Sequence, residues 1–272
     1  MGGFQLDHGV TIGEPGRLFL LAGPCVLEGG DVPLRIGRAV RDICRELDLP
    51  YVFKASFDKA NRSSKDGHRG PGLDEGLAAL ARIKAELGVP VLTDVHLPEQ
   101  CAPAAEVVDV LQIPAFLSRQ TDLIEAAART GRAVNVKKGQ FLSPWEARHP
   151  VKKAQAAGCE RVMITERGFT FGYNNLVVDM RAFPIMRQLG VPVVFDATHS
   201  LQLPGAGGDR TAGQREYIPH LARAAVAAGI DGLFAEVHFD PASSPSDAEN
   251  ILHLDQLRPL LETLLKIKAL VP

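Results

Sequence analysis

The stretch LDEGLAALARIKAELGVPVLTDV, residues 73–95, contains the unit from which the whole chain is built. Residues 73–88 form a helix pattern that ends at a glycine, which commonly stops a helix by adopting left-handed backbone angles. Residues 90–95 are apolar almost throughout, as is typical of a strand covered on both faces. The same helix, glycine and strand order recurs before residues 192–198 and 232–238. The pattern predicts helices that alternate with parallel strands.

Strand patterns of this kind occur eight times, at residues 17–23, 51–57, 90–95, 110–114, 133–138, 161–166, 192–198 and 232–238. Helix-forming stretches lie between them, and about 250 residues in this order are typical of a (β/α)8 barrel. We therefore predict an α/β fold in which residues 1–272 form a single (β/α)8 TIM barrel, with residues 1–16 as a short N-terminal β-hairpin that caps the barrel. An open, doubly wound sheet is the competing fold, but AGPCVLEGG (22–30) is not the glycine-rich turn that such a sheet usually has. The stretches 204–214 and 240–250, rich in Gly, Pro and Ser, are predicted loops.

Composition excludes several classes of protein. With 46% hydrophobic and 23% charged residues the chain is not a disordered one, and no apolar run reaches the roughly 18 residues of a membrane-spanning helix. The formal charge of −2 argues against nucleic-acid or anionic-membrane partners. The N-terminus resembles no export signal, and Cys25, Cys44, Cys101 and Cys159 form no C-x-x-C pair. We expect a cytoplasmic protein with reduced thiols.

Ionisable side chains occur at the carboxyl ends of the predicted strands, where the chemistry of a barrel gathers. One group is cationic and comprises Lys54, Lys59, Arg62, Arg69, Arg119, Lys137 and Arg167. Such clustering predicts a positively charged mouth suited to phosphate and carboxylate groups. The alternative for each cation is an ordinary ion pair with a neighbouring acid.

The second group combines a thiol, an imidazole and two carboxylates: Cys25, His199, Glu236 and Asp247. The first and eighth strands are neighbours in a closed barrel, so these residues are expected to converge. The donor set suits a divalent metal such as zinc, iron, manganese, cobalt or cadmium. Alternatively, Cys25 is a small buried hydrophobe, His199 a core histidine and Asp247 a helix cap. No nucleotide phosphate loop, H-E-x-x-H or G-x-S-x-G motif is present.

Longer motifs carry a specific resemblance. They are FKASFDKANRSS (53–64), RGPGL (69–73), TDVH (93–96), LQIPAFLSRQTDL (111–123), VKKGQFLSPWE (136–146), ERGFTFGYNNLVVDMR (166–181), FDATHSLQLPG (195–205) and EVHFDP (236–241). Over nearly the whole chain the sequence resembles the 3-deoxy-D-manno-octulosonate 8-phosphate synthases. That family implies a homotetrameric barrel that condenses phosphoenolpyruvate with D-arabinose 5-phosphate and water, releasing phosphate, in the synthesis of a lipopolysaccharide precursor.

The resemblance also implies roles for individual residues. The phosphoenolpyruvate carboxylate is expected near Lys54, Ser56, Lys59 and Gln112, and its phosphate near the Ala115 amide, Lys137 and Arg167. Arabinose 5-phosphate is expected near Asn61, Arg62 and Ser63, with Arg119 of a neighbouring subunit at its phosphate. Candidates for proton transfer are Asp94, His96 and Asp247.

Two subclasses of the family differ at the first strand end, and GPCVLE (23–28) resembles the metal-dependent one. The resemblance therefore implies that Cys25, His199, Glu236 and Asp247 hold a metal, which would orient the aldehyde or activate the attacking water. One departure is KDGH (65–68), where the family commonly has a different stretch beside the sugar phosphate.

Three other functions stay open. A 3-deoxy-arabino-heptulosonate 7-phosphate synthase would use erythrose 4-phosphate, although its sugar-phosphate motif resembles K-P-R-T-S rather than KANRSS (59–64). A sialic-acid-type synthase would carry a further C-terminal domain. A non-catalytic phosphate-binding barrel would lose the cationic group or the metal ligands.

Overall fold

The computed structural model describes residues 2–60, 67–207 and 210–271, and it shows a closed barrel of eight parallel strands. In order around the barrel the strands are β3 (Phe19–Gly23), β4 (Tyr51–Lys54), β5 (Val91–Asp94), β6 (Val110–Ile113), β7 (Ala133–Lys137), β8 (Val162–Glu166), β11 (Val193–Asp196) and β14 (Gly232–His238). Pairing of β14 with both β11 and β3 closes the cylinder and excludes an open sheet. The predicted (β/α)8 barrel is confirmed.

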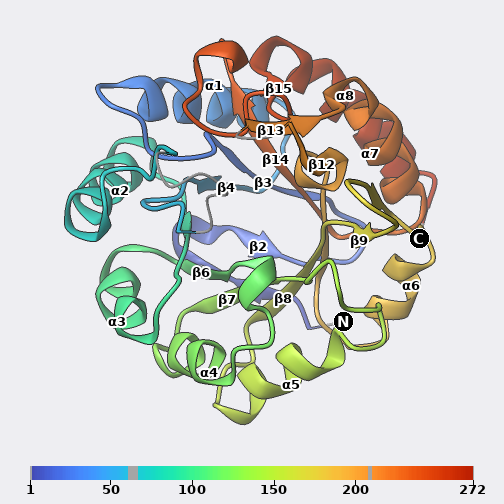
Figure 1. Cartoon of the computed structure of the whole chain (residues 1–272), viewed down its shortest axis with the longest axis horizontal. Coiled ribbons are helices and arrows are strands. Elements are labelled where there is room, and N and C mark those ends of the chain that lie inside the picture. Colours follow the sequence, from blue (N-terminus) through green and yellow to red (C-terminus); the bar gives the residue numbers. More distant parts are fainter. Residues whose placement is uncertain (1, 61–66, 208–209, 272) are drawn as a thin grey trace.

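The helices form a ring around the strands (Figure 1). They are α1 (Val32–Glu46), α2 (Leu73–Leu87), α3 (Pro98–Val107), α4 (Thr121–Arg129), α5 (Arg148–Ala156), α6 (Ala182–Arg187), α7 (Ile218–Ala227) and α8 (Leu254–Lys268). Helix α2 ends where the sequence predicts, because Gly88 takes a left-handed φ of 62° and returns its N–H to the Lys84 carbonyl. The buried helix faces and the outward strand residues form one apolar core around the barrel.

A second, smaller core fills the amino-terminal half of the barrel interior. It contains alternate strand residues such as Leu21, Leu92 and Phe234, since every second side chain of a strand points inward. The hairpin formed by β1 (Phe4–Gln5) and β2 (Thr11–Ile12) adds Leu6 and Ile12 to this cluster and thereby covers the barrel end. The predicted N-terminal hairpin is confirmed.

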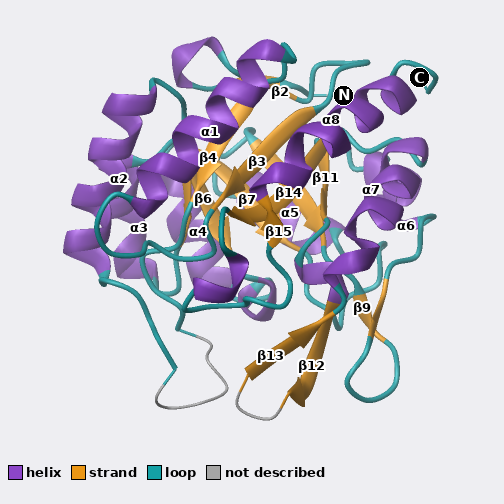
Figure 2. Ribbon diagram, turned by 90° about the horizontal axis from the view of Figure 1, so that it is seen from above, coloured by secondary structure: helices purple, strands orange, loops and turns teal. Residues whose placement is uncertain are grey.

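The prediction of a loop at 204–214 is wrong. Strands β12 (Gln202–Gly207) and β13 (Arg210–Gly213) form an antiparallel hairpin there, with Leu203 opposite Ala212. It projects from the end of the barrel away from the N-terminal hairpin, beside the short pair β9 (Phe169–Thr170) and β10 (Leu176–Val177) (Figure 2). Glycine and proline normally weaken a strand, so the composition concealed it. The last strand, β15 (Leu252–His253), pairs in parallel with the end of β14.

In the described part of the chain, none of the helices combines the length and the apolar character that a membrane crossing requires.

Candidate active site

The inward face of the barrel changes from apolar to polar along each strand. On β4, β5 and β14 the inward residue after Val52, Leu92 and Phe234 is an ionisable one. These residues are Lys54, Asp94 and Glu236, and on β6, β7, β8 and β11 the corresponding positions hold Gln112, Asn135, Thr165 and Asp196. All seven are buried. Because each lies toward the carboxyl end of its strand, together they produce one polar chamber there.

The chamber opens into a cavity of about 710 Å³. Its described lining includes eleven of the residues predicted from sequence: Lys54, Lys59, Asp94, His96, Gln112, Ala115, Lys137, Arg167, His199, Glu236 and Asp247. Segments far apart in the sequence thus meet at one rim, as expected for a barrel site.

Glu236 contacts two lysines, Lys54 on β4 and Lys59 in the segment that follows β4. Its Oε1 accepts a hydrogen bond of 2.6 Å from Lys54 Nζ and lies 3.8 Å from Lys59 Nζ. Burial alone would raise the pKa of Glu236, but Lys54, His199 and Lys59 together lower it well below the usual range. The pKa of Lys59 is raised, because Cys25, Glu236 and Asp94 outweigh its own burial. Glu236 and Lys59 are therefore charged at neutral pH.

Asp196, on the neighbouring strand β11, plays the same part for Lys137. Its fully buried carboxylate accepts hydrogen bonds from Lys137 Nζ and from His199 Nδ1, the latter at 2.8 Å. Burial nevertheless lowers the pKa of Lys137 to about 8, although Asp196 opposes that effect. Asp196 thus orients the His199 ring, and His199 Nε2 lies 3.5 Å from Glu236 Oε1.

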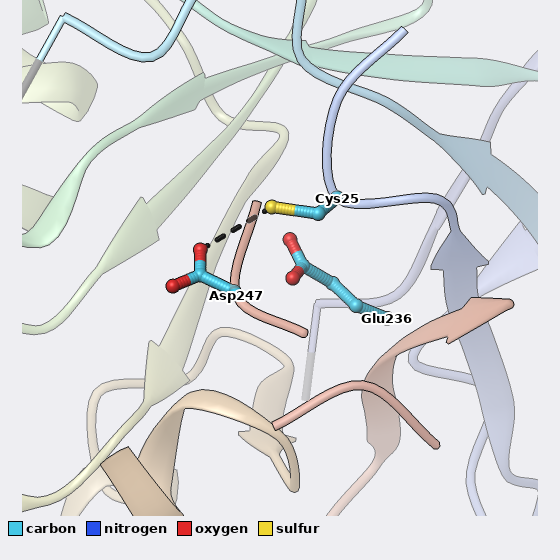
Figure 3. Close-up of side chains that lie close together, drawn as sticks. All are labelled: Cys25, Glu236 and Asp247. Atoms are coloured by element: carbon cyan, nitrogen blue, oxygen red, sulfur yellow. Dashed lines mark hydrogen bonds between the residues drawn. The ribbon is translucent and has the colours of Figure 1, made fainter. Parts of the chain in front are cut away.

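Cys25, Glu236 and Asp247 form the candidate metal centre (Figure 3). One donor atom of each lies within 4.8 Å of the others. The Cys25 thiol donates to Ser246 Oγ at 2.9 Å and lies 3.3 Å from Asp247 Oδ2. Burial, and then Glu236, raise the pKa of this thiol well above its usual value. The predicted fourth ligand, His199, is not part of this group, although its Nε2 lies 3.5 Å from Glu236 Oε1.

Gln112, Arg167 and Ala115 lie on the side of the cavity remote from Cys25. Gln112 lies on β6, and its side-chain oxygen accepts from Asn135 Nδ2 at 3.0 Å. Arg167 follows β8 and donates to Gln202 Oε1 at 2.5 Å. Ala115 begins a 3-10 turn, where the first amide groups have no partner within the turn. Each can therefore present N–H groups to an anion.

Asp94 and His96 form a separate acid–imidazole pair, with 3.1 Å between Asp94 Oδ2 and His96 Nε2. Despite burial, His96 and Lys59 lower the pKa of Asp94 far below its usual value. Both side chains line the cavity.

The comparisons with known proteins agree with this geometry. The DAHP synthetase I family matches residues 3–271. Proteins named 2-dehydro-3-deoxyphosphooctonate aldolase are 56% identical in Trichlorobacter lovleyi, over 96% of both chains, and 54% identical in Desulfatibacillum aliphaticivorans, over 97% of both. A third, from Acidithiobacillus ferrooxidans, is 56% identical over 97% of this chain and 94% of its own.

The chain belongs to the DAHP synthetase I family. The resemblance drawn from the motifs is confirmed, and the relatives place the chain among the 2-dehydro-3-deoxyphosphooctonate aldolases, another name for the octulosonate 8-phosphate synthases.

Several predicted residues lie elsewhere. Ser56 is completely buried and does not line the cavity. Arg119 is exposed, lies outside the cavity lining and offers its carbonyl oxygen to Lys153 Nζ. Asn61, Arg62 and Ser63 lie outside the described residues.

Three further residues of the cavity were not among the predicted site residues. They are Asp196, Gln202 and Ser246, each of which lines the cavity and contacts a predicted residue. Gln202 also approaches Asp247, with 3.4 Å from its Nε2 to Oδ1, and so connects Arg167 with the candidate metal centre. Asp196 lies two residues after the inward-facing Val194 on the same strand, and this spacing was a signal that its side chain also points inward. No local signal marked the other two.

The prediction of a positively charged mouth is not met by the described lining. It carries four lysine and arginine cations, Lys54, Lys59, Lys137 and Arg167, and five carboxylates, Asp94, Asp196, Glu236, Asp247 and Glu249. The acids are close to the cations because an unpaired buried charge is costly.

Proposed function

We propose that the protein condenses phosphoenolpyruvate with D-arabinose 5-phosphate and water, forming 3-deoxy-D-manno-octulosonate 8-phosphate and phosphate. The observation that carries this assignment is the identity of more than half of the residues, over nearly full length, with relatives that carry one enzyme name. The polar chamber supports it, since it combines cations and amide donors with acid–base groups in one cavity.

Phosphoenolpyruvate fits the side of the cavity that carries Lys54, Gln112, Lys137 and Arg167. Lysine and arginine bind phosphate and carboxylate through charge-assisted hydrogen bonds. The Ala115 amide and Arg167 lie beyond the ends of β6 and β8, while Lys54 and Gln112 lie deeper on their strands. We assign the phosphate to the first pair with Lys137 and the carboxylate to the second.

The chemistry then requires C3 of phosphoenolpyruvate to attack the aldehyde carbon, while water adds at C2. The resulting tetrahedral hemiketal phosphate expels phosphate. Lys54, Lys59 and Lys137 stabilise charge on the carboxylate and phosphate as the bonds change. His96, held by Asp94, is placed to move a proton at the cavity wall.

A divalent metal fits the group formed by Cys25, His199, Glu236 and Asp247. Glu236 Oε2 is buried with no hydrogen-bond partner among the described residues, as expected for an oxygen that awaits a ligand. A thiol and two carboxylates suit a borderline cation such as Zn²⁺, Fe²⁺, Mn²⁺, Co²⁺ or Cd²⁺. When bound, the ion supplies positive charge that orients the aldehyde oxygen or acidifies water. Binding requires the Cys25 thiol to lose its proton.

A homotetramer is the proposed assembly. Phe116, Phe141, Trp145, Phe171 and Tyr173 are large apolar side chains that stay exposed, on the segments after β6, β7 and β8. Exposed patches of this kind are typical of interfaces. Arg119 lies outside the cavity of its own chain but close in sequence to Phe116. We therefore expect Arg119 to reach the sugar phosphate bound by a neighbouring copy.

The cytoplasm is the proposed location, as all four cysteines are free thiols. A product with this carbon skeleton supplies the octulosonate sugar of lipopolysaccharide.

The test is phosphate release from phosphoenolpyruvate with arabinose 5-phosphate and, separately, with erythrose 4-phosphate. The second arm is needed because the matching family carries the heptulosonate enzyme's name. Release with arabinose 5-phosphate alone supports the proposal. Release only with erythrose 4-phosphate assigns the alternative enzyme, and binding of phosphoenolpyruvate without release with either sugar assigns a non-catalytic barrel.

A further inference from the structure

Three uncharged side chains form a hydrogen-bonded ladder across the barrel interior. Thr165 Oγ1 on β8 donates to Asn135 Oδ1 on β7 at 2.7 Å, and Asn135 Nδ2 donates to Gln112 Oε1 on β6 at 3.0 Å. Thr165 and Asn135 are completely buried, and Gln112 alone reaches the cavity. The ladder therefore runs from the interior to the proposed carboxylate site.

The ladder has a direction, because a glutamine amide has different ends. With its oxygen bonded to Asn135, Gln112 keeps its NH₂ group for the cavity. The opposite direction would turn the oxygen toward the cavity. It would also make Thr165 an acceptor, and its hydroxyl proton would then have no acceptor that the described residues show. A buried hydroxyl that loses its only bond destabilises that arrangement.

Asp94 favours the same direction. It lies opposite Gln112 in the register of β5 and β6, and its buried Oδ1 has no hydrogen-bond partner in the described part of the chain. A carboxylate beside Gln112 attracts an NH₂ group and repels a carbonyl oxygen.

We propose that Asn135 and Thr165 are positioning residues, which hold Gln112 so that its amide donates to the substrate carboxylate. This inference rests on the proposed binding of phosphoenolpyruvate. The physical need is simple: a carboxylate only accepts hydrogen bonds, so a reversed amide would set two oxygens against each other. Neither residue touches substrate, and both act through Gln112.

Asn135→Asp tests the proposal, because a carboxylate of the same shape accepts from Thr165 and also from the Gln112 NH₂ group. It therefore turns the glutamine oxygen toward the cavity. We expect the Kd of phosphoenolpyruvate, measured by titration calorimetry with this substrate alone, to rise about 10- to 100-fold, the factor for breaking a charge-assisted hydrogen bond. The KM of arabinose 5-phosphate should stay within about twofold of the parent value, since binding of that substrate does not draw on Gln112.

A double-mutant cycle separates positioning from general damage. In a Gln112→Ala background the Asn135→Asp change should leave the Kd of phosphoenolpyruvate within about twofold, because the group through which it acts is gone. An equal rise in both backgrounds would overturn the proposal, and so would an unchanged Kd in the single variant. If the parent protein itself does not bind phosphoenolpyruvate, the proposed function fails instead.

A milder pair covers the case in which Asn135→Asp does not fold. Thr165→Val keeps the shape but removes one of the two groups that set the direction, so the reversed amide gains population while Asp94 still opposes it. The Kd should then rise, by at most about twofold. Thr165→Ser keeps the hydroxyl and should retain the parent Kd, although both variants lose some thermal stability. Equal Kd values for the two variants would refute the ladder.

Discussion

The Asp196→Asn variant examines the chamber where its charges are most closely packed. The Asp196 carboxylate is fully buried and accepts from Lys137 Nζ, His199 Nδ1 and the Thr198 hydroxyl. The amide has the same shape but no charge, so the Lys137 ammonium loses its partner inside the barrel. Removing one member of a buried ion pair costs about 3–5 kcal/mol of stability. We expect a loss near the upper end. The Thr198 hydroxyl and two backbone amides hold the amide oxygen at the Oδ1 position, so the NH₂ group takes the Oδ2 position and faces Lys137.

The same substitution should also weaken the candidate metal centre. An amide NH₂ group turned toward His199 would donate to Nδ1 and move the ring proton to Nε2, the atom that faces Glu236. Loss of such an orienting partner lowers metal affinity about 10- to 100-fold. Zn²⁺ affinity, measured by competition with a chromophoric chelator, reports this effect without any turnover.

Asp179→Asn is the matched control. Asp179 also pairs with a cation, Arg181, at 2.8 Å, but that pair is largely exposed. Its removal should change the free energy of unfolding in urea by less than about 1 kcal/mol. If Asp196→Asn unfolds at the same urea concentration as the control and binds Zn²⁺ like the parent protein, the proposed role of Asp196 is wrong.

Four further outcomes are expected. Affinity for phosphoenolpyruvate should fall as pH rises through about 8, where Lys137 loses its charge, and a Lys137→Arg variant should lack this decline in a pH series of titrations. The pKa of Lys137 in the folded protein, about 8, lies below its usual value of 10.5, so between pH 8 and 10.5 the unfolded chain binds one more proton. Lys137 should therefore make the free energy of unfolding increase with pH in that range. An equal increase in the Lys137→Arg variant, measured by urea unfolding at several pH values, would contradict this. Dialysis against a strong chelator should abolish phosphate release and added Mn²⁺ or Zn²⁺ should restore it, whereas full activity of metal-free protein would refute the metal requirement. A Cys25→Ala variant with unchanged metal content and rate would exclude the thiolate as a ligand. Gln202→Leu should weaken phosphoenolpyruvate binding about fivefold by releasing Arg167, with the fold intact by circular dichroism; an unchanged titration would show that the Gln202 contact is unimportant.

The barrel was predictable because its signal is local and repeated. Every strand of the cylinder falls within a predicted range, since a strand covered on both faces must be apolar along its length. The hairpin β12–β13 gave no such signal, as its pairing depends on backbone bonds between residues such as Leu203 and Ala212. Glycine and proline there indicated a loop, and the tertiary arrangement overrode that preference.

The site was predictable as a set of residues but not as a network. Cys25, Glu236 and Asp247 converge because β3 and β14 are neighbours, which the closed barrel already implied. The partners of those residues were not predictable, since Gln202 and Ser246 meet them only through folded loops. Pairing across the barrel also decides the charge of the mouth, and no count along the sequence gives that charge.

The charge balance of the chamber bears on the proposed metal. Lysines buried without partners would destabilise the barrel, and Glu236 and Asp196 are the partners of Lys54 and Lys137. The same acids, however, repel the two phosphorylated substrates, since the described lining holds one more carboxylate than it has lysine and arginine cations. A divalent ion at the proposed site would offset that excess, because its two positive charges exceed the one negative charge that Cys25 gains on losing its proton. Stability and anion binding therefore make opposite demands on the lining, and the proposed metal would serve both without another buried lysine.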